Sequence, residues 1–510
     1  MSNFPRASGV LLHPTALPGP HGIGTLGTPA LNFLNWLEHA GQSYWQICPL
    51  IPTGYGDSPY QGFSAFAGNP NLLDMENLVQ FKLLKPEDLR PLTRLPVHWV
   101  DFKRLIPAKN RILRLAWQNF VEGKGPAAFI EGMQSFQERE SFWLDDFTLF
   151  MVIKHAHGGV PWNQWPDNFR FRRKNTLEKF CRENADEIGF QVFLQYVFYT
   201  QWQQVRRAAE KRGIGIIGDL PIFVSYDSAD CWAHHDLFQL DQYRFPLRVA
   251  GVPPDYYSST GQLWGNPLYN WEQMEKDGFS WWISVIRKQL SQYDLLRVDH
   301  FRGFAAYWSV PFGHLTAEKG QWVAAPGEKL FSTLREKTKA LPVIAEDLGV
   351  ITPDVVKLIE KCGFPRMKVL QFAFDSSEEN DYLPHTYEKN CVVYTGTHDN
   401  DTAAGWYEHA KKHDQRAAAE YLNLPENADA QAVAAAMVRT AMASVAHLAV
   451  FPLQDILGLG SNARFNIPGT LGGNWIWRAD SDSFSLKRAR ELRSLTRIYG
   501  RLNSKTDSLP

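Results

Sequence analysis

Four acidic residues follow short apolar segments of the sequence, at the points where strands would end. Asp219, Asp299, Glu346 and Asp399 stand in the strings GDLPIFV, RVDHFRG, AEDLG and GTHDND. Carboxyl groups that gather at one point repel one another, so one gains a raised pKa and becomes a proton donor while others stay ionised. Cleavage of a glycosidic bond needs this division of labour: one carboxylic acid protonates the leaving oxygen, and one carboxylate attacks or stabilises the anomeric carbon.

Acids at strand ends can also stabilise the fold or bind a metal ion. An isolated acid after a strand is more often a helix cap or a member of an ion pair, and we interpret Asp347 and Asp401 in this way. Clusters of Asp, Glu and His also bind Mg²⁺ or Zn²⁺. The sequence contains neither an HExxH string nor an EF-hand pattern. We therefore expect carboxylate chemistry with no metal and no cofactor.

Eight apolar segments, several of them continuous rather than alternating, are typical of parallel strands covered on both faces. Helical periodicity lies between them, and this alternation predicts an α/β fold, a closed (β/α)₈ TIM barrel. The strand ends of a barrel converge on one face, so acids far apart in sequence would meet there. The segments are 9–13, 44–50, 215–224, 294–300, 342–347, 367–374, 391–398 and 447–453.

Helix boundaries are marked at several places. Thr28 is predicted to cap a helix that continues with a proline and ends at Gly41. Thr352 is predicted to open a second helix, which ends at Gly363. A third is expected over the alanine-rich residues 432–447.

Two spacings between the predicted strands are too long for a simple crossover. They cover about 51–190, with helical patterns at 105–122 and 143–157, and about 225–275. Both would leave the C-terminal face of their strands, where barrel active sites are built. We expect one catalytic domain over 1–510, with these insertions after strands 2 and 3 forming subdomains around a cleft.

Composition limits the classes of partner. The net charge is −1 and no long run of like charges occurs, so we expect no nucleic-acid partner. No apolar stretch is long enough to span a membrane, and no signal peptide is recognisable. The five cysteines are far apart without a CxxC pair, which favours a reduced, cytoplasmic protein. The 18 tryptophans would mostly fill the core, with a few providing stacking faces for sugar rings. The oligomeric state stays open.

The strings around the acids resemble those of the amylomaltases, also called 4-α-glucanotransferases or disproportionating enzymes, in glycoside hydrolase family 77 of the α-amylase clan. The resemblance extends over nearly the whole chain, in the same order. Further matching strings are LLHPTALPGPHGIGTLG, PTGYGDSPYQGFSAFAGNP, GVPPDYYSSTGQLWGNPLYNW and LGLGSNARFNIPGT.

The resemblance implies roles for individual residues. Asp299 would be the nucleophile that forms a covalent β-glycosyl-enzyme, and Arg297 would keep it ionised. Glu346 would be the general acid and then the base, and Asp399 the third carboxylate. Tyr55 would belong to a second glucan site, or else pack within the fold. The residues implied to bind substrate are Ser58, Tyr60, Asp219, Arg297, Asp255, Gln262, Trp264, His398 and Asn466.

The segment 251–271 would decide what attacks the intermediate. The resemblance implies a loop arching over the cleft, where Trp264 and Tyr256 would exclude water but admit a sugar. The implied activity is retaining transfer of an α-1,4-glucan segment to the 4-hydroxyl of glucose or of another glucan. Retention predicts carboxyl groups of Asp299 and Glu346 about 5–5.5 Å apart, against about 6.5–9.5 Å for inversion. The alternatives are an α-amylase-like or debranching hydrolase, or a glucan-binding protein without catalysis.

Overall fold

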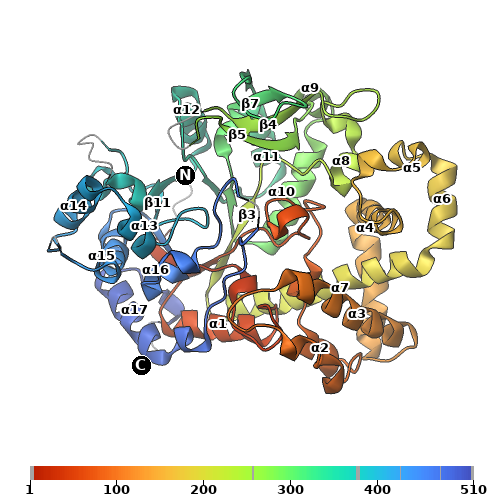
Figure 1. Ribbon diagram of the computed structural model, residues 1–510, viewed down its shortest axis with the longest axis horizontal. Helices are drawn as coiled ribbons and strands as arrows, with labels where there is room; N and C mark the ends of the chain where they lie inside the picture. Colours follow the sequence, from red (N-terminus) through yellow and green to blue (C-terminus); the bar gives the residue numbers. More distant parts are fainter. Residues whose placement is uncertain (1–4, 255–257, 375–379, 426, 471, 507–510) are drawn as a thin grey trace.

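Eight parallel strands close into a barrel in the order β1-β12-β11-β10-β9-β6-β3-β2, as predicted (Figure 1). The computed structural model describes residues 5–254, 258–374, 380–425, 427–470 and 472–506. Each strand overlaps one predicted segment, and most strands are shorter than the segment that predicted them. The strands are β1 (Ala7–Leu11), β2 (Tyr44–Gln46), β3 (Gly215–Leu220), β6 (Leu295–Val298), β9 (Val343–Ala345), β10 (Arg366–Val369), β11 (Cys391–Tyr394) and β12 (Leu448–Pro452).

Burial explains why these segments are strands. All residues of β11 and β12 are buried, as expected for strands covered by side chains inside the barrel and by helices outside it. Gly218 in β3 lies so close to Tyr293 that a Cβ atom would come within 2.2 Å of its ring. The glycine therefore allows the element before β6 to pack directly on the strand that carries Asp219.

The helix boundaries agree with the sequence in part. The prediction that Thr28 caps the first helix is wrong, because α1 (Thr28–His39) already includes it and Gly27 is the N-cap. α12 (Pro353–Cys362) has Thr352 at its N-cap position, without a hydrogen bond from its side chain to the helix backbone, and ends at Gly363, whose φ of 64° suits glycine. α15 (Ala430–Ala443) starts earlier than expected, because the side chain of Asp429 caps it, and it ends earlier as well.

The insertion after β2 is a helical subdomain, at the lower and right sides of Figure 1. The long helix α7 (Ala185–Lys211) leads from it back to β3, so the predicted boundary near 190 falls inside a helix. α4 begins well before the predicted 143–157 pattern. The other helices here are α2 (Met75–Gln80), α3 (Phe102–Val121), α4 (Ala127–Ala156), α5 (Asp167–Arg170) and α6 (Lys174–Glu183).

A four-stranded antiparallel sheet, β5-β4-β7-β8, stands above the barrel in Figure 1. The insertion after β3 contributes β4 (Arg248–Val252) and β5 (Gln262–Pro267). The segment 251–271, expected as a loop, is therefore largely a hairpin arm. The other two strands, β7 (Ala306–Pro311) and β8 (Gln321–Ala324), follow β6 and were not predicted. β8 has only four residues and is mostly exposed, so it is too short to show the pattern that marks a strand.

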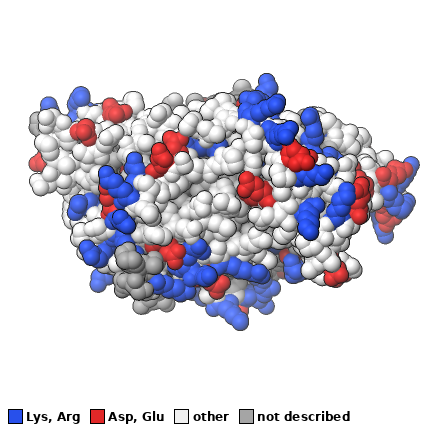
Figure 2. Space-filling model, turned by 90° about the horizontal axis from the view of Figure 1, so that it is seen from below, with Lys and Arg blue, Asp and Glu red and all other residues white. Residues whose placement is uncertain are grey.

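The remaining helices cover the barrel and its sheet extension. None of the helices in the described part of the chain combines the length and the apolar character needed to cross a bilayer. Figure 2 shows one face on which the middle is largely free of charge, while Lys and Arg outnumber acids along the lower edge. These helices are α8 (Ala229–Ala233), α9 (Trp271–Lys276), α10 (Ser280–Gln292), α11 (Gly327–Lys337), α13 (Ala403–His409), α14 (Lys412–Tyr421), α16 (Leu453–Leu457) and α17 (Leu486–Ile498).

Candidate active site

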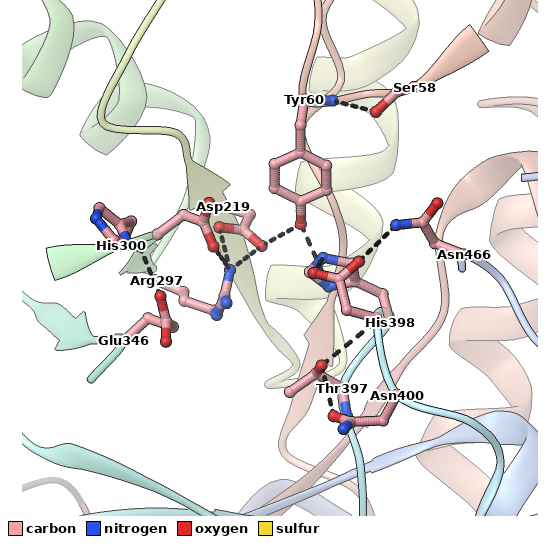
Figure 3. Close-up of polar contacts among 12 residues, drawn as sticks. Ser58, Tyr60, Asp219, Arg297, His300, Glu346, Thr397, His398, Asn400 and Asn466 are labelled. Atoms are coloured by element: carbon pink, nitrogen blue, oxygen red, sulfur yellow. Dashed lines mark hydrogen bonds and ion pairs between the residues drawn. The ribbon is translucent and has the colours of Figure 1, made fainter. Parts of the chain in front are cut away.

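The four acids identified in the sequence meet at the C-terminal end of the barrel. Figure 3 labels two of them, Asp219 and Glu346, together with the residues that hold the others. Asp219 lies in β3, Asp299 and Glu346 directly follow β6 and β9, and Asp399 lies in the turn after β11. The side chains of Asp299 and Asp399 are 29% and 47% exposed, so both can be reached from the outside. The arrangement is that of a barrel active site, in which residues from different strands share one face.

Arg297 holds two of these acids together. Its Nη1 atom lies 2.7 Å from Asp219 Oδ2 and 2.9 Å from Asp299 Oδ1, so the expected pair of Arg297 and Asp299 is present. Burial raises the pKa of Asp299, and the guanidinium of Arg297 acts in the opposite direction. Burial also disfavours the charged guanidinium, but its two carboxylate partners hold the pKa of Arg297 well above its ordinary value. A permanent positive charge thus lies against the exposed carboxyl group of Asp299.

Glu346 has an environment that keeps a proton on it near neutral pH. Its side chain accepts hydrogen bonds from the backbone N–H groups of His300, at 2.6 Å, and Leu348, at 2.7 Å. Burial raises the pKa of Glu346 to about 7, although Arg297 acts to lower it. His300 has a left-handed backbone with φ of 49°, which turns the chain directly after Asp299. Nothing in the sequence identifies His300 as a support for Glu346, because left-handed geometry at a non-glycine residue has no clear sequence signal.

Asp399 has the opposite environment. Burial acts to raise its pKa, but the positive charge and hydrogen bond of His398, together with the amide of Asn466, hold the pKa of Asp399 below its ordinary value. The His398 Nε2 atom is 3.3 Å from Asp399 Oδ2, and Asn466 Nδ2 donates to Oδ1 at 2.6 Å. The carboxylate in turn raises the pKa of His398 against the effect of burial. Asp399 is thus an ionised group, whereas Glu346, at the same end of the barrel, is a proton donor.

Tyr60 contacts both Asp219 and His398. Its hydroxyl donates to Asp219 Oδ2 at 2.7 Å and lies 3.3 Å from His398 Nδ1. Its ring stacks on His398, with 4.8 Å between centroids and 17° between planes. One face of the ring is therefore occupied by protein. The Ser58 hydroxyl accepts a hydrogen bond from the Tyr60 N–H at 3.2 Å, which places Ser58 in the turn that orients Tyr60.

Two residues of the hairpin arm reach the Glu346 side of the site. The ring of Trp264, on β5, meets His300 edge-on at 4.7 Å. Its Nε1–H donates to Gln262 Oε1 at 3.2 Å. Asp255, and with it Tyr256, lies outside the described residues, as does the side chain of Tyr55 in the one-turn segment Tyr55–Asp57.

Asp347 and Asp401, which we interpreted as acids that stabilise the fold, both accept hydrogen bonds from neighbouring residues. Asp347 Oδ2 accepts from Arg366 Nε at 2.5 Å, and its Oδ1 accepts from a backbone N–H at 2.9 Å. Asp401 accepts from the hydroxyl of Ser461 at 2.7 Å and from the N–H of Thr402 at 2.8 Å. Within the described ranges, no three His, Cys, Asp or Glu side chains are grouped so that they could hold a metal ion.

Two residues not singled out in the sequence complete the wall around Asp399. Arg464 donates through Nη2 to the Asp399 carbonyl at 2.5 Å. Buried Trp475, whose φ is 62°, lies 5.7 Å from the ring of His398 and 5.9 Å from that of Tyr60. Arg464 stands in one of the family-like strings, but Trp475 is one of 18 tryptophans with nothing in the sequence to distinguish it.

Comparison with known proteins shows the family to which this chain belongs. Residues 12–483 match the model of the 4-alpha-glucanotransferase family. The chain belongs to the 4-alpha-glucanotransferase family. A 4-alpha-glucanotransferase from Thermus thermophilus is 49% identical over 506 residues, covering 98% of this chain and 100% of that protein.

Solved structures agree with this membership. Amylomaltase from Streptococcus agalactiae, determined in complex with acarbose, has a TM-score of 0.93 and 38% identity, covering 97% of this chain and 99% of that one. Amylomaltase from Corynebacterium glutamicum, at 19% identity, shares the fold with a TM-score of 0.78 over 98% of this chain and 75% of its own length.

Proposed function

We propose that this protein transfers segments of α-1,4-glucans from a donor to the 4-hydroxyl of an acceptor, with retention of configuration. The observation that carries the proposal is the contrast between two neighbouring carboxyl groups. Burial raises the pKa of both groups, to about 7 for Glu346, but Asp299 lies in direct contact with the guanidinium of Arg297, which opposes this rise. A retaining reaction needs these two states, an ionised nucleophile and a protonated acid.

In the first step, Asp299 attacks C1 of the sugar whose bond is cleaved. The bond from C1 to the leaving oxygen breaks, and that oxygen takes the proton of Glu346. In the second step, the 4-hydroxyl of the acceptor gives its proton to Glu346 and attacks C1, which releases Asp299. Asp399, held ionised by His398 and Asn466, would bind hydroxyls of the reacting sugar. The separation of about 5–5.5 Å between the carboxyl groups of Asp299 and Glu346 remains a prediction.

The substrates in this proposal are α-1,4-glucans and maltooligosaccharides, with glucose as a small acceptor. The family is named for glucan transfer, and the amylomaltase of Streptococcus agalactiae binds the sugar analogue acarbose. The five cysteines are free of disulfides, which supports a cytoplasmic location. Asp255, Gln262 and Trp264 would contact the acceptor, and Tyr55 a second glucan site. Ser58, Tyr60 and Asp219 would shape the donor subsite.

Incubation with maltotriose as the sole substrate is expected to give glucose and a ladder of longer maltooligosaccharides. Transfer keeps the number of reducing ends constant, whereas hydrolysis raises it. Chromatography of the products and an assay of total reducing ends measure both. Steady shortening without longer products would show a hydrolase instead, and no turnover at all would support the glucan-binding alternative.

Replacing Trp264 with alanine is expected to increase severalfold the share of the intermediate that water attacks. The ring packs on His300 beside Glu346, where it would exclude water from the side on which the acceptor enters. The growth of reducing ends per transfer event measures this share. Trp322→Ala, on β8 at the other edge of the same sheet, is the matched control. If the gain of reducing ends per transfer event were the same in both variants, Trp264 would not shield the intermediate from water.

A further inference from the structure

A buried acid that the proposed reaction does not use contacts both ends of the turn 395–403, which carries Asp399. This acid, Asp455, is the third residue after β12 and belongs to the short helix α16. Only 1% of its surface is exposed, so no substrate can reach it. Burial raises the pKa of Asp455 to about 6, and hydrogen bonds from its neighbours act to lower it. Burying a carboxyl group costs free energy of folding unless hydrogen bonds satisfy it, so its partners show what it holds.

The two oxygen atoms of Asp455 hold opposite ends of this turn. Oδ2 accepts a hydrogen bond from the hydroxyl of Thr395 at 2.5 Å, and Thr395 is the first residue after β11. Oδ1 accepts from the backbone N–H of Ala403 at 2.7 Å, and Ala403 is the first residue of α13. The carboxyl group therefore ties the end of a barrel strand to the start of the next helix, across the residues His398 and Asp399.

Contacts within the turn extend this constraint to Asp399. The side chain of Asn400 accepts from both the N–H and the hydroxyl of Thr397, each at 2.9 Å (Figure 3). The hydroxyl of Thr397 in turn accepts from the N–H of Asp399 at 3.3 Å. Gln371, which follows β10, donates through Nε2 to the carbonyl of Asp401 at 2.8 Å. With its ends fixed and its middle cross-linked, the turn leaves the backbone at Asp399 little freedom.

The preceding residue of α16 holds the opposite wall of the site. Gln454, which is also buried, donates through Nε2 to the carbonyl of Ala463 at 3.1 Å. The residues that follow include Arg464 and Asn466, which donate to the carbonyl and to the carboxylate of Asp399. One short helix therefore fixes both segments whose contact sets the orientation of this carboxylate.

A merely structural role is the alternative, and the chain contains a matched example of it. Asp74 is buried and makes the same pair of contacts. Its Oδ2 accepts from the hydroxyl of Thr25 at 2.6 Å, and its Oδ1 accepts from the N–H of Asn77 in the first turn of α2 at 2.9 Å. These contacts tie the loop before α1 to α2, and neither element carries a residue of the proposed reaction. What distinguishes Asp455 is the turn between its two partners.

We propose that Asp455 is a positioning residue for glucan transfer, which acts through the turn 395–403 to hold Asp399 against the reacting sugar. The proposal rests on the proposed function. Asp399 would bind sugar hydroxyls more strongly as the ring distorts toward the transition state, so a shift of its carboxylate should lower kcat more than it changes KM. A displacement of about 1 Å at such a group can cost roughly 10²-fold in rate.

Asp455→Ala is expected to lower kcat for maltotriose by about 10- to 100-fold per folded molecule, with little change in KM. Asp74→Ala loses the same two kinds of contact, so it should lower the temperature of unfolding to a similar degree and yet keep its kcat. Initial rates of glucose release, divided by the folded fraction from circular dichroism, measure the effect. Equal losses of kcat in the two variants, or no loss in either, would overturn the positioning role.

A double-mutant cycle with Asp399→Asn separates positioning from a general weakening of the fold. If Asp455 acts through Asp399, then Asp455→Ala should cost less than about twofold in the Asp399→Asn background. Release of fluoride from α-maltosyl fluoride, a donor with a good leaving group, keeps the rates of slow variants measurable. Losses that multiply in the double variant would show that Asp455 acts on something other than Asp399.

Thr395→Val and Thr395→Ser test one half of the contact without removing the buried acid, and so do not depend on the stability of Asp455→Ala. Valine keeps the shape of the side chain but loses the hydroxyl, so kcat should fall severalfold. Serine keeps the hydroxyl and should retain most of the rate. Equal kcat values in these two variants would overturn the proposal. If the unchanged protein forms no transfer products from maltotriose, the proposed function itself is wrong.

Discussion

Asp299→Asn is expected to reduce kcat for maltotriose by about four to six orders of magnitude. The amide has nearly the shape of the carboxylate and can keep a contact with Arg297, so the fold should survive. It cannot supply the negative charge that attacks C1 and stabilises the positive charge developing there. The measurement is glucose release and the product ladder, alongside thermal unfolding of both proteins.

The matched control lies at the other end of the same strand. Asp294→Asn removes a partly exposed partner of Arg206 just before β6, far from the C-terminal end of the barrel. Exposed ion pairs contribute about 0–1 kcal/mol, so this variant should unfold slightly earlier and keep its kcat. If Asp299→Asn behaved like the control, the assigned nucleophile would be wrong.

A small anion can test the face of attack directly. In Asp299→Gly, azide can enter the space that the carboxylate leaves, and α-maltosyl fluoride supplies a donor with a good leaving group. The C1–F bond breaks as the C1–N bond forms from the side of Asp299, so the product is expected to be β-maltosyl azide. An α-linked azide would place the nucleophile on the opposite face of the sugar.

The barrel and its acids were predictable from the sequence because their signals are local. Short apolar strings followed by Asp or Glu mark a strand and its end, and closure of the barrel brings Asp219, Asp299, Glu346 and Asp399 together. The assignment of Asp347 to structure was likewise correct, since it pairs with Arg366. The catalytic roles themselves came from the family resemblance, and they remain predictions until the variants are measured.

Other features depend on contacts between distant segments and leave little trace in one sequence. The sheet that carries Trp264 pairs β4 with β7, two short strands that come before and after β6 in the sequence. Trp475 reaches His398 only because the loop after α16 folds back over the barrel. His300 supports Glu346 through its backbone N–H, a group that every residue except proline possesses.

The electrostatic division within the site also required the structure. From sequence, Glu346 and Asp399 are both acids at strand ends. In the folded protein, burial leaves Glu346 with a raised pKa although two backbone N–H groups act to lower it, whereas His398 and Asn466 lower the pKa of Asp399. This difference is what allows neighbouring carboxyl groups to take opposite roles at one pH.

Glu346→Gln is expected to reduce kcat/KM for maltotriose by roughly 10²- to 10⁴-fold, with a much smaller loss for the first step with α-maltosyl fluoride. The sugar oxygen of maltotriose needs a proton to leave, and glutamine cannot give one. Fluoride leaves without that proton. Single-turnover release of fluoride therefore measures attack by Asp299 alone, and product analysis of maltotriose measures the step that needs Glu346.

The pH profile gives the same assignment independently. Burial raises the pKa of Glu346 to about 7, so the proton donor is present below that pH and is lost above it. The kcat/KM of the unchanged protein should therefore fall as the pH rises through about 7. On the acid side it should fall as Asp299 becomes protonated, at a pH above that of a free aspartate, because burial raises the pKa of this group. Because Asp299 and Glu346 interact, the apparent pKa on each side of the pH profile describes the two groups together.

In Glu346→Gln the alkaline limb should disappear while the acid limb remains, because only Asp299 still titrates. Glu360→Gln, an exposed position on α12, should keep both limbs and the full rate. An alkaline limb that persisted in Glu346→Gln would place the proton donor on another residue. Equal losses for maltotriose and α-maltosyl fluoride would mean that Glu346 supports the shape of the site rather than the departure of the sugar oxygen.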